Sequence, residues 1–576
     1  MKVLKKILIY LAFIIGIVVV AALICFAVMF FVPGTSILGY EYVLYNDKTT
    51  TEYATTDPLV SGVQALEIIT EATDIYVIPN AGSNMLKVYH EQGLSGYAKS
   101  INADLNIEIK TKNTSFEESL TTYKTFSINI DEPNGWIAKS RANIYVYVPS
   151  TLSLNTIYAR STSGNVHYIS ENTIEVKDEE TKEVTEVSAT LRCTNLYLKT
   201  GEYGKLDIDN KYDISNYYLK TGHGNAQFTN VQSISANTIK FETLTGLLNV
   251  TNTAKDATLN LTNKLEIESY DDYTGPRINI NKLNGNLVVN ANNGSYTINT
   301  IGSFGMPKTV AMTLNQAYIN FGTVYAHVSI LGEGSDVENN ITITRLDYDL
   351  KTNAIECGNG NTTIHNLNGN VSVDSTSGNI NIKNATIESN IYTYSTSGSV
   401  NVKYVASEAD NEATKLTILT RTGNVNLENI SCSLELQVLS NSANSKVNIV
   451  FTSIATVDNI INARNRKVNI TLKGDGPEFQ HRIVSTKAVI KADDVPGGEV
   501  STEYDADNSI NDDYLLKYEQ YKDYNYGYRI GYTKKIRTQQ EILDGVPPSH
   551  YESRDYDLTG KLLITCSGAT LKSTLV

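Results

Sequence analysis

The sequence predicts an all-β protein, a β-solenoid of single-stranded, β-helix-like coils of about 20 residues behind one N-terminal transmembrane helix. Three observations support this fold class. Residues 7–32 form an apolar run without a charged side chain. A glycine followed by alternating apolar residues then recurs along most of the chain. Neighbouring copies, such as those at Gly378 and Gly398, lie about 20 residues apart, which is too short for separate sandwich domains and suits solenoid coils.

The apolar run at residues 7–32 predicts a membrane anchor. As a helix it would be about 39 Å long, enough to cross the apolar core of a bilayer. Residues 1–6 carry three lysines and no acid, and the first charge after the run is Glu41. By the positive-inside rule, residues 1–6 are then a cytoplasmic tail and the bulk of the chain is extracellular. We therefore expect a single-pass protein of the cell membrane, with residues 33–60 as a linker.

Two other roles for this run fit less well. A cleaved signal peptide has a shorter apolar region that ends in a small-x-small site, and no such site follows the run. A lipoprotein signal at Cys25 would need a small residue before the cysteine, where Ile24 stands. An uncleaved anchor is therefore the prediction.

The composition of the 576-residue chain argues against some partners. The chain is 19% charged, with a formal net charge of −14 and a pI near 5.1, which suits a large folded protein. No basic stripe follows the N-terminal lysines. Nucleic acids and anionic polymers are held by clustered lysine and arginine, so the net charge argues against either as the main partner.

The repeated motif of a glycine followed by alternating apolar residues, here called the glycine phrase, predicts a corner followed by a half-buried strand. Two and four positions after each phrase glycine the residue is apolar, with Thr362 as the exception, and the residue between them is mostly polar. Such alternation is typical of a strand with one buried face, and we expect the glycine to turn the corner with a positive φ. We therefore expect a solenoid over residues 61–500, with an array of antiparallel sandwiches or barrels as the rival fold. The phrase glycines are Gly164, Gly204, Gly224, Gly246, Gly285, Gly294, Gly360, Gly369, Gly378, Gly398, Gly423 and Gly560.

Three segments interrupt the phrase. Residues 171–190 place two strand-like stretches around a charged turn, which predicts a solvated hairpin insertion, with a binding finger as the alternative. Residues 301–350 keep the alternation without the phrase, and we expect irregular coils there. Residues 501–576 are rich in tyrosine and predict a C-terminal cap with closing strands, because an open solenoid end needs cover. A tyrosine platform for sugars or proteins is the alternative there. The tyrosines at helical and then strand spacing are Tyr514, Tyr518, Tyr521, Tyr524, Tyr526 and Tyr528.

The cysteines of the extracellular part show no disulfide framework. They lie far apart, and no CxxC occurs among them. Cys357 stands three residues before Gly360, in the place that Ser375 takes before Gly378, which predicts a small buried residue. The redox state of the four does not follow from the sequence: Cys193, Cys357, Cys432 and Cys566.

No catalytic, cofactor-binding or metal-ligating residues are predicted. His90 and Glu91 are followed by Leu94, where a zinc-protease helix needs its second histidine, and the other histidines are scattered. No G-x-S-x-G motif or phosphate-binding loop is present. The acidic pairs and acidic glycine turns are weak candidates, because turn residues are mostly solvated. They are Asp271–Asp272, Asp493–Asp494, Asp512–Asp513 and the segments 332–336 and 474–478.

Two segments carry a family resemblance. Residues 65–93 and 143–168, with an apolar strand, Val-Pro, a second strand and T-S-G-N-V, resemble the bacterial putative-adhesin family of β-strand repeat domains of unknown function. The resemblance returns at residues 557–568. It implies a β-solenoid-like envelope domain behind a membrane anchor, and some members belong to envelope-stress loci. The family supplies no catalytic residues to carry over.

Together these features predict a membrane-anchored extracellular protein of a bacterial cell envelope, with an adhesin-like binding role or a structural role and no enzymatic activity. The alternatives are a sensor or regulatory partner of an envelope-stress signalling system and, third, a polysaccharide-active enzyme. The outward polar row at Asn381, Asn401 and Asn426 suits many weak hydrogen bonds to a protein or glycan ligand. The identity of that ligand and the oligomeric state do not follow from the sequence.

Overall fold

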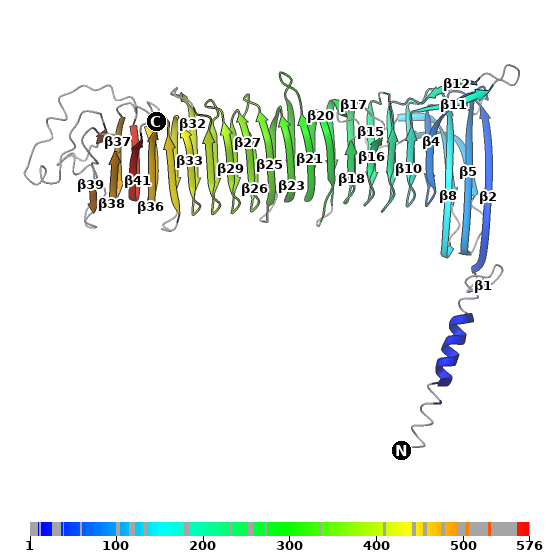
Figure 1. The fold of residues 1–576 in the computed structure, drawn as a ribbon. Helices are drawn as coiled ribbons and strands as arrows, with labels where there is room; N and C mark the ends of the chain where they lie inside the picture. Colours follow the sequence, from blue (N-terminus) through cyan, green and yellow to red (C-terminus); the bar gives the residue numbers. More distant parts are fainter. Residues whose placement is uncertain are drawn as a thin grey trace, which may run out of the picture. The chain divides into compact units, whose positions relative to one another are not determined.

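A computed structural model describes most of the chain. Residues 13–25 are helical with exposed side chains, and this helix covers part of the predicted anchor at 7–32 (Figure 1). Within the described residues, no helix is long and apolar enough to span a bilayer. The described residues are 10, 13–25, 36–37, 40–57, 60–98, 104–114, 121–131, 135–177, 184–212, 214–229, 233–250, 257–270, 274–332, 336–406, 411–439, 445–452, 458–473, 479–485, 487–492, 502–505, 528–530 and 561–574.

The chain divides into two compact units, Met1–Glu268 and Ser269–Val576. In unit 1 the strands form two stacks, here called 1A and 1B, in which neighbouring strands are paired. Stack 1A contains, in spatial order, β6 (Asp104–Thr114), β7 (Thr121–Asp131), β3 (Ala65–Thr70), β9 (Thr156–Ser161), β13 (Asn195–Thr200), β15 (Asn216–Thr221), β17 (Ser233–Thr243) and β19 (Thr258–Glu268). Stack 1B contains β1 (Ser36–Ile37), β2 (Tyr40–Ala54), β5 (Met85–Ala98), β8 (Gly135–Pro149), β4 (Asp74–Asn80), β10 (Val166–Ile169), β14 (Leu206–Asp209), β16 (Ala226–Thr229) and β18 (Leu247–Val250).

Unit 2 is built in the same way, from stacks 2A and 2B. Both begin at β20 (Arg277–Asn290), whose first half pairs with β21 and whose second half pairs with β22. Stack 2A continues through β21 (Asn293–Ile301), β23 (Gln316–Val324), β25 (Glu338–Asp347), β27 (Thr362–Asn368), β29 (Ile380–Ala385), β31 (Val400–Tyr404), β33 (Val425–Ile430) and β35 (Lys446–Phe451). Stack 2B continues through β22 (Lys308–Thr313), β24 (Ala326–Leu331), β26 (Asn353–Gly358), β28 (Val371–Ser375), β30 (Ile391–Ser395), β32 (Asn411–Thr420) and β34 (Cys432–Val438).

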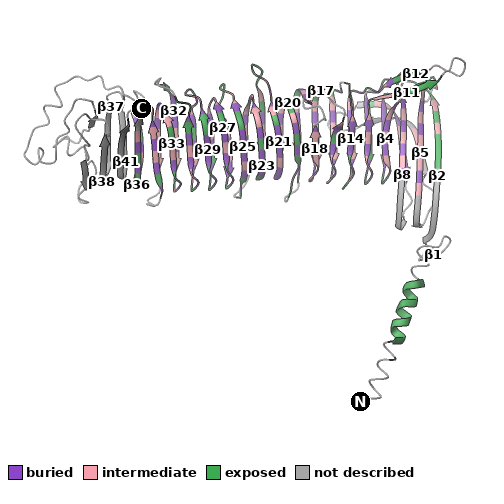
Figure 2. Ribbon diagram, viewed as in Figure 1, coloured by how far each residue is buried: buried purple, intermediate pink, exposed green. Residues whose placement is uncertain are grey.

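These stacks confirm the predicted β-solenoid, because successive coils pair in parallel with like residues aligned. Ile380 pairs with Val400 and Asn381 with Asn401, so each inner position of a coil lies beside an inner position of the next. Figure 2 shows the resulting alternation of buried and more exposed residues along the strands. In unit 1 the core lies between the stacks, where Tyr217 of stack 1A contacts Phe228 of stack 1B edge-on at 5.4 Å between ring centroids.

The corner glycines confirm the phrase, but the predicted reason for them is wrong. Among the described phrase glycines, only Gly294 and Gly369 have a positive φ. At most of the other corners the coils approach too closely for a side chain. A Cβ on Gly398 would lie 1.8 Å from the carbonyl oxygen of Gly378, and one on Gly378 would lie 1.5 Å from that of Gly360. Glycine is needed because the backbone of the adjacent corner fills the space of a Cβ.

The residue three positions before the glycine also behaves as predicted. Cys357, Ser375 and Ser395 are fully buried. The Ser395 hydroxyl donates to the carbonyl of Gly398 at 2.9 Å, closing the corner. Cys193, Cys357 and Cys432 are free thiols, while the side chain of Cys566 lies outside the described residues. Burial raises the pKa of Cys193 to about 12, so that this thiol stays protonated and unreactive at neutral pH.

Residues 33–60, predicted as a linker, contain strand β2, which pairs antiparallel with β5 from Glu41 to Ala54. The physical reason is that β5 would otherwise be an unpaired sheet edge. Residues 301–350, predicted as irregular coils, instead carry β22 to β25 in register with their neighbours. The alternation of apolar and polar residues is enough to place these strands in the stacks. Pairing between coils requires apolar residues on the inner face, and it does not require a glycine at the corner.

The hairpin predicted at residues 171–190 is confirmed. Strands β11 (Glu171–Lys177) and β12 (Val184–Thr190) pair antiparallel in a two-stranded sheet of their own (Figure 1). The hairpin is tied to the coil through Asn172, whose Nδ2 donates to the carbonyl of Pro79 at 3.1 Å. Ile174, Val176 and Val184 are exposed on it.

The C-terminal strand lies inside the stacks. Strand β36 (Asp458–Lys473) continues both stacks of unit 2, and β41 (Lys561–Thr574) pairs parallel with it. The other edge of β41 pairs with β37 (Phe479–Ser485) and β38 (Lys487–Ala492). Strand β41, the last in the sequence, therefore lies between β36 and the strands that directly follow β36 in the chain. Strands β39 (Thr502–Asp505) and β40 (Tyr528–Ile530) pair antiparallel with β38 and β37. The other predicted cap tyrosines, 514 to 526, lie outside the described residues.

Candidate ligand-binding site

Of the residues considered for catalysis, His90 and Glu91 lie in the part of the chain that the structure describes. His90 is buried on β5, and its neighbour Glu91 pairs with Lys48 at 2.8 Å. The acidic pairs lie outside the described residues, as does most of both acidic glycine turns. Among the residues that the structure describes, no group of three His, Cys, Asp or Glu side chains could hold a metal ion.

The outward asparagine row forms a ladder of side-chain hydrogen bonds. Nδ2 of Asn401 donates to Oδ1 of Asn381 at 2.7 Å, and Asn426 donates to Asn401 at 2.7 Å. Asn448 and Asn469 extend the ladder, each bond being 2.8 Å long. Each inner amide of the ladder therefore uses one donor and one acceptor on its neighbours, which stabilises the stacking of coils and leaves fewer groups for a ligand than predicted.

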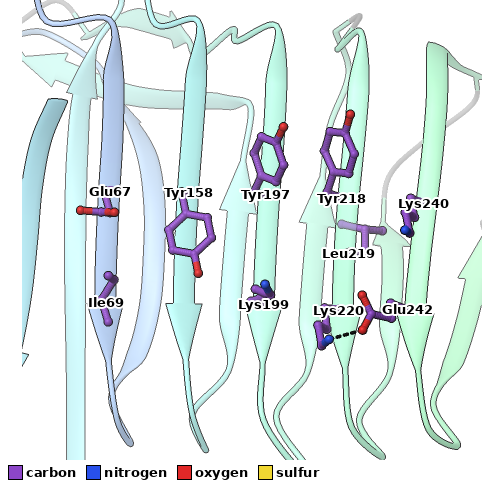
Figure 3. A pocket seen from close by; sticks show the side chains of 10 residues that line it. All are labelled: Glu67, Ile69, Tyr158, Tyr197, Lys199, Tyr218, Leu219, Lys220, Lys240 and Glu242. Atoms are coloured by element: carbon purple, nitrogen blue, oxygen red, sulfur yellow. Dashed lines mark hydrogen bonds and ion pairs between the residues drawn. The ribbon is translucent and has the colours of Figure 1, made fainter. Parts of the chain in front are cut away.

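A more promising surface lies on the outer face of stack 1A. Three successive coils carry tyrosine at the same strand position, in the stretches IYAR, LYLK and YYLK. Parallel pairing aligns Tyr158, Tyr197 and Tyr218 side by side, while the residues flanking them point into the core. The three tyrosines line a groove, here called the tyrosine groove (Figure 3). Its ten lining residues are Glu67, Ile69, Tyr158, Tyr197, Lys199, Tyr218, Leu219, Lys220, Lys240 and Glu242.

The rings of Tyr197 and Tyr218 point the same way along their strands, whereas the ring of Tyr158 points the opposite way (Figure 3). Tyr197 and Tyr218 are stacked, with 4.3 Å between ring centroids and 3° between ring planes. Tyr158 is tilted by 49° from Tyr197, at 6.5 Å. Glu67 on β3 pairs with Tyr158, and Lys240 on β17 pairs with Tyr218, so these two charged residues lie at the two ends of the tyrosine row. The groove has a volume of about 180 Å³; Tyr158 is buried in it, whereas Tyr197 and Tyr218 are partly exposed.

A second row of outward side chains, two residues further along each strand, is basic. Arg160, Lys199 and Lys220 are aligned by the same pairing. Lys220 forms an ion pair with Glu242 (Figure 3). Among the ion pairs of the described residues, none involves Arg160 or Lys199. The groove therefore borders two cations whose charge is not neutralised by a neighbouring carboxylate.

The other outer face of unit 1 also carries aromatic rings, but these are more fully engaged. Tyr76 stacks on Tyr145 at 4.6 Å and on His167 at 4.3 Å. His167 in turn lies 3.5 Å from Asp207. Burial is the main cause that raises the pKa of Tyr76, and the nearby acidic groups add to it. The ring is therefore packed against its neighbours, which suits a structural role.

Sequence reasoning missed the tyrosine groove, although a signal is present. The pattern Tyr-x-Lys/Arg-Thr/Ser stands ahead of the corner in three consecutive coils. Tyr158 and Tyr197 are separated by the hairpin insertion, which obscures the common spacing. The tyrosine row and the basic row both occupy the outward positions of the strands, so a comparison of those positions between coils, rather than of the apolar inner positions, would reveal them.

The fold defines a β-solenoid repeat protein, with a tyrosine-lined groove on the outer face of its coils. Residues 337–413 match the family Toastrack DUF4097. Over these residues the chain is similar to a domain family of unknown function, in keeping with the resemblance seen in the sequence.

Among solved structures, the chain is similar to a putative adhesin from Parabacteroides merdae ATCC 43184. The identity is 9%, the match covers 60% of this chain and 96% of that chain, and the TM-score is 0.21. No functional conclusion follows from a likeness this weak. No curated protein matches the sequence.

Proposed function

We propose that the protein is a non-enzymatic binding protein of a bacterial cell envelope, anchored by residues 7–32, that holds an extracellular ligand in the tyrosine groove. The in-register row of Tyr158, Tyr197 and Tyr218 carries this proposal. Aromatic side chains that combine an apolar body with a hydroxyl group suit recognition surfaces. A row that repeats from coil to coil suits an extended ligand that lies along the stack.

The arrangement of carboxylates supports binding rather than glycan cleavage. A glycosidase needs two carboxyl groups that flank the bond to be cleaved. In the tyrosine groove, Glu67 accepts a hydrogen bond from Ser127 and Glu242 is paired with Lys220. Both carboxylates are thus engaged with neighbours on the sheet surface.

A sensor or regulatory role is the second candidate, favoured by the β11–β12 hairpin. Val176 is 42% exposed and Val184 is 56% exposed on this arm. Exposed apolar side chains on a projecting hairpin suit a protein partner. Loss of a membrane neighbour from co-purification when both valines are replaced by serine would support this role.

Binding through the groove is tested by truncating its tyrosines. We expect Tyr197→Ala with Tyr218→Ala to weaken capture of the full-length, detergent-solubilised chain about 10-fold or more, because buried aromatic contacts dominate recognition. The measurement is retention on immobilised polygalacturonate, mannan, mucin and fibronectin. Tyr318→Ala is the control, since this tyrosine is 67% exposed on β23 in unit 2. If no probe is captured in a way that depends on the groove tyrosines, the proposal is wrong.

The membrane orientation is tested by protease. The lysines before the apolar run lead us to expect that protease added to intact, wall-stripped cells digests nearly the whole chain and leaves a short N-terminal stub. Immunoblots against tags at the two ends provide the measurement, and a cytoplasmic protein that stays uncut shows that the cells are sealed. Complete protection of the chain would contradict an extracellular location.

A further inference from the structure

We infer that the ligand of the tyrosine groove is a linear acidic glycan, a chain of sugar rings with a carboxylate on each unit. This inference rests on the proposed binding function and specifies its ligand. Two rows of outward side chains carry it: the tyrosines offer hydroxyl groups and ring edges, and Arg160 and Lys199 of the second row offer positive charge.

The geometry of the two rows matches a polymer of regular repeat. Within one strand the tyrosine and the cation are two residues apart, about 6.7 Å, on the same face of the sheet. From coil to coil both rows advance by about 4.8 Å. That step is close to the advance of one sugar ring in an extended glycan. In the coils of β9 and β13 a sugar unit can therefore contact the tyrosine while its carboxylate contacts Arg160 or Lys199.

The charges favour an anionic chain and limit its extent. Arg160 can bind a carboxylate through two parallel hydrogen bonds, and Lys199 supplies a further charge-assisted bond. Beyond Lys220 the same row continues with Glu242 and then Glu268. An anionic polymer is attracted over the coils of β9 and β13, where Arg160 and Lys199 lie, and repelled beyond Lys220, whose charge Glu242 balances. The net negative charge of the whole chain does not prevent this, because salt screens charges more than about 10 Å away.

The ring packing favours a glycan over a single-stranded nucleic acid. Nucleic-acid bases bind by stacking on aromatic faces. Tyr197 and Tyr218 are stacked on each other with centroids 4.3 Å apart, so no base fits between them. Their hydroxyl groups can form hydrogen bonds with carboxylates and sugar hydroxyls, and their ring edges offer apolar contact.

The test measures binding to the full-length, detergent-solubilised chain by titration calorimetry. The probes are an octagalacturonate, a neutral mannooctaose and an inorganic polyphosphate of about eight units. We expect the octagalacturonate to bind tightest, with an affinity that falls as salt rises. Arg160→Gln with Lys199→Gln should weaken it about 10-fold or more, because each position loses a charge-assisted bond. Lys205→Gln, which removes an exposed lysine outside the groove, should bind as the native chain does.

Three results would overturn the inference: equal affinity for the mannooctaose, equal affinity for the polyphosphate, or native affinity for octagalacturonate in the Arg160/Lys199 double variant. If the octagalacturonate does not bind while another probe is captured through the groove tyrosines, the ligand class is wrong and the binding function stands. If no probe depends on the tyrosines, both are wrong. Unchanged circular dichroism and melting temperature exclude misfolding of the variants.

Discussion

Replacing Gly398 by alanine is expected to unfold the coils around it and to lower the free energy of unfolding by about 3 kcal/mol or more. The new Cβ would lie 1.8 Å from the carbonyl oxygen of Gly378, and this oxygen belongs to the backbone of the adjacent corner. Relief would require the coils to separate, which would break parallel pairing on both sides. Because each coil is stabilised by its neighbours, the damage should spread along unit 2.

Urea unfolding followed by circular dichroism measures this loss, and hydrogen exchange locates it. Gly305→Ala is the matched control. Gly305 has a φ of +79° but no atom lies within 4 Å of the position of its Cβ. It should therefore lose only about 1 kcal/mol through backbone strain. Equal losses at both glycines would show that close approach of the coils is not what requires glycine at position 398.

Replacing Ile380 by aspartate is expected to unfold the same region, because it buries an unpaired carboxylate at a cost of several kcal/mol. Ile380 is fully buried and pairs with Thr362 and Val400 in the adjacent coils. Asn381→Asp, one residue later, should change the free energy of unfolding by no more than about 0.5 kcal/mol. A carboxylate can still accept the hydrogen bond that Asn401 donates to position 381.

Thermal unfolding of the two variants measures the difference between the faces. A strand has a period of two, so a one-residue shift moves a side chain from the core to the surface. Equal destabilisation by Ile380→Asp and Asn381→Asp would mean that the two faces are assigned wrongly. Normal folding of Ile380→Asp would have the same meaning.

The repeating part of the fold was predictable because it depends on local pattern. Alternation identifies the buried face, and the spacing of Gly378 and Gly398 identifies the coil length. The hairpin at 171–190 was predictable for the same reason, since a charged turn between two strand-like stretches needs no information from elsewhere. The expectation of irregular coils at 301–350 was wrong because it relied on the corner phrase, whereas pairing depends on the inner apolar residues.

The candidate site could not be read in the same way. Tyr158 and Tyr197 are distant in sequence and become neighbours only when the coils stack. The same is true of the basic row, which the net charge of the chain concealed. The asparagine row was predicted to face outward, but only the distances between coils showed that Asn381 and Asn401 bond to each other. The membrane anchor, the extracellular location and the identity of the ligand stay predictions.

By itself, the sequence determined the all-β class, the solenoid coils, the buried face of each strand and the position of the hairpin, because each is set by residues close together in the chain. The tertiary structure alone decided why the corners need glycine, which side chains form the tyrosine groove and where strand β41 inserts. These features depend on the distance and register between coils. Residues distant in sequence come together there, and no local pattern specifies which ones.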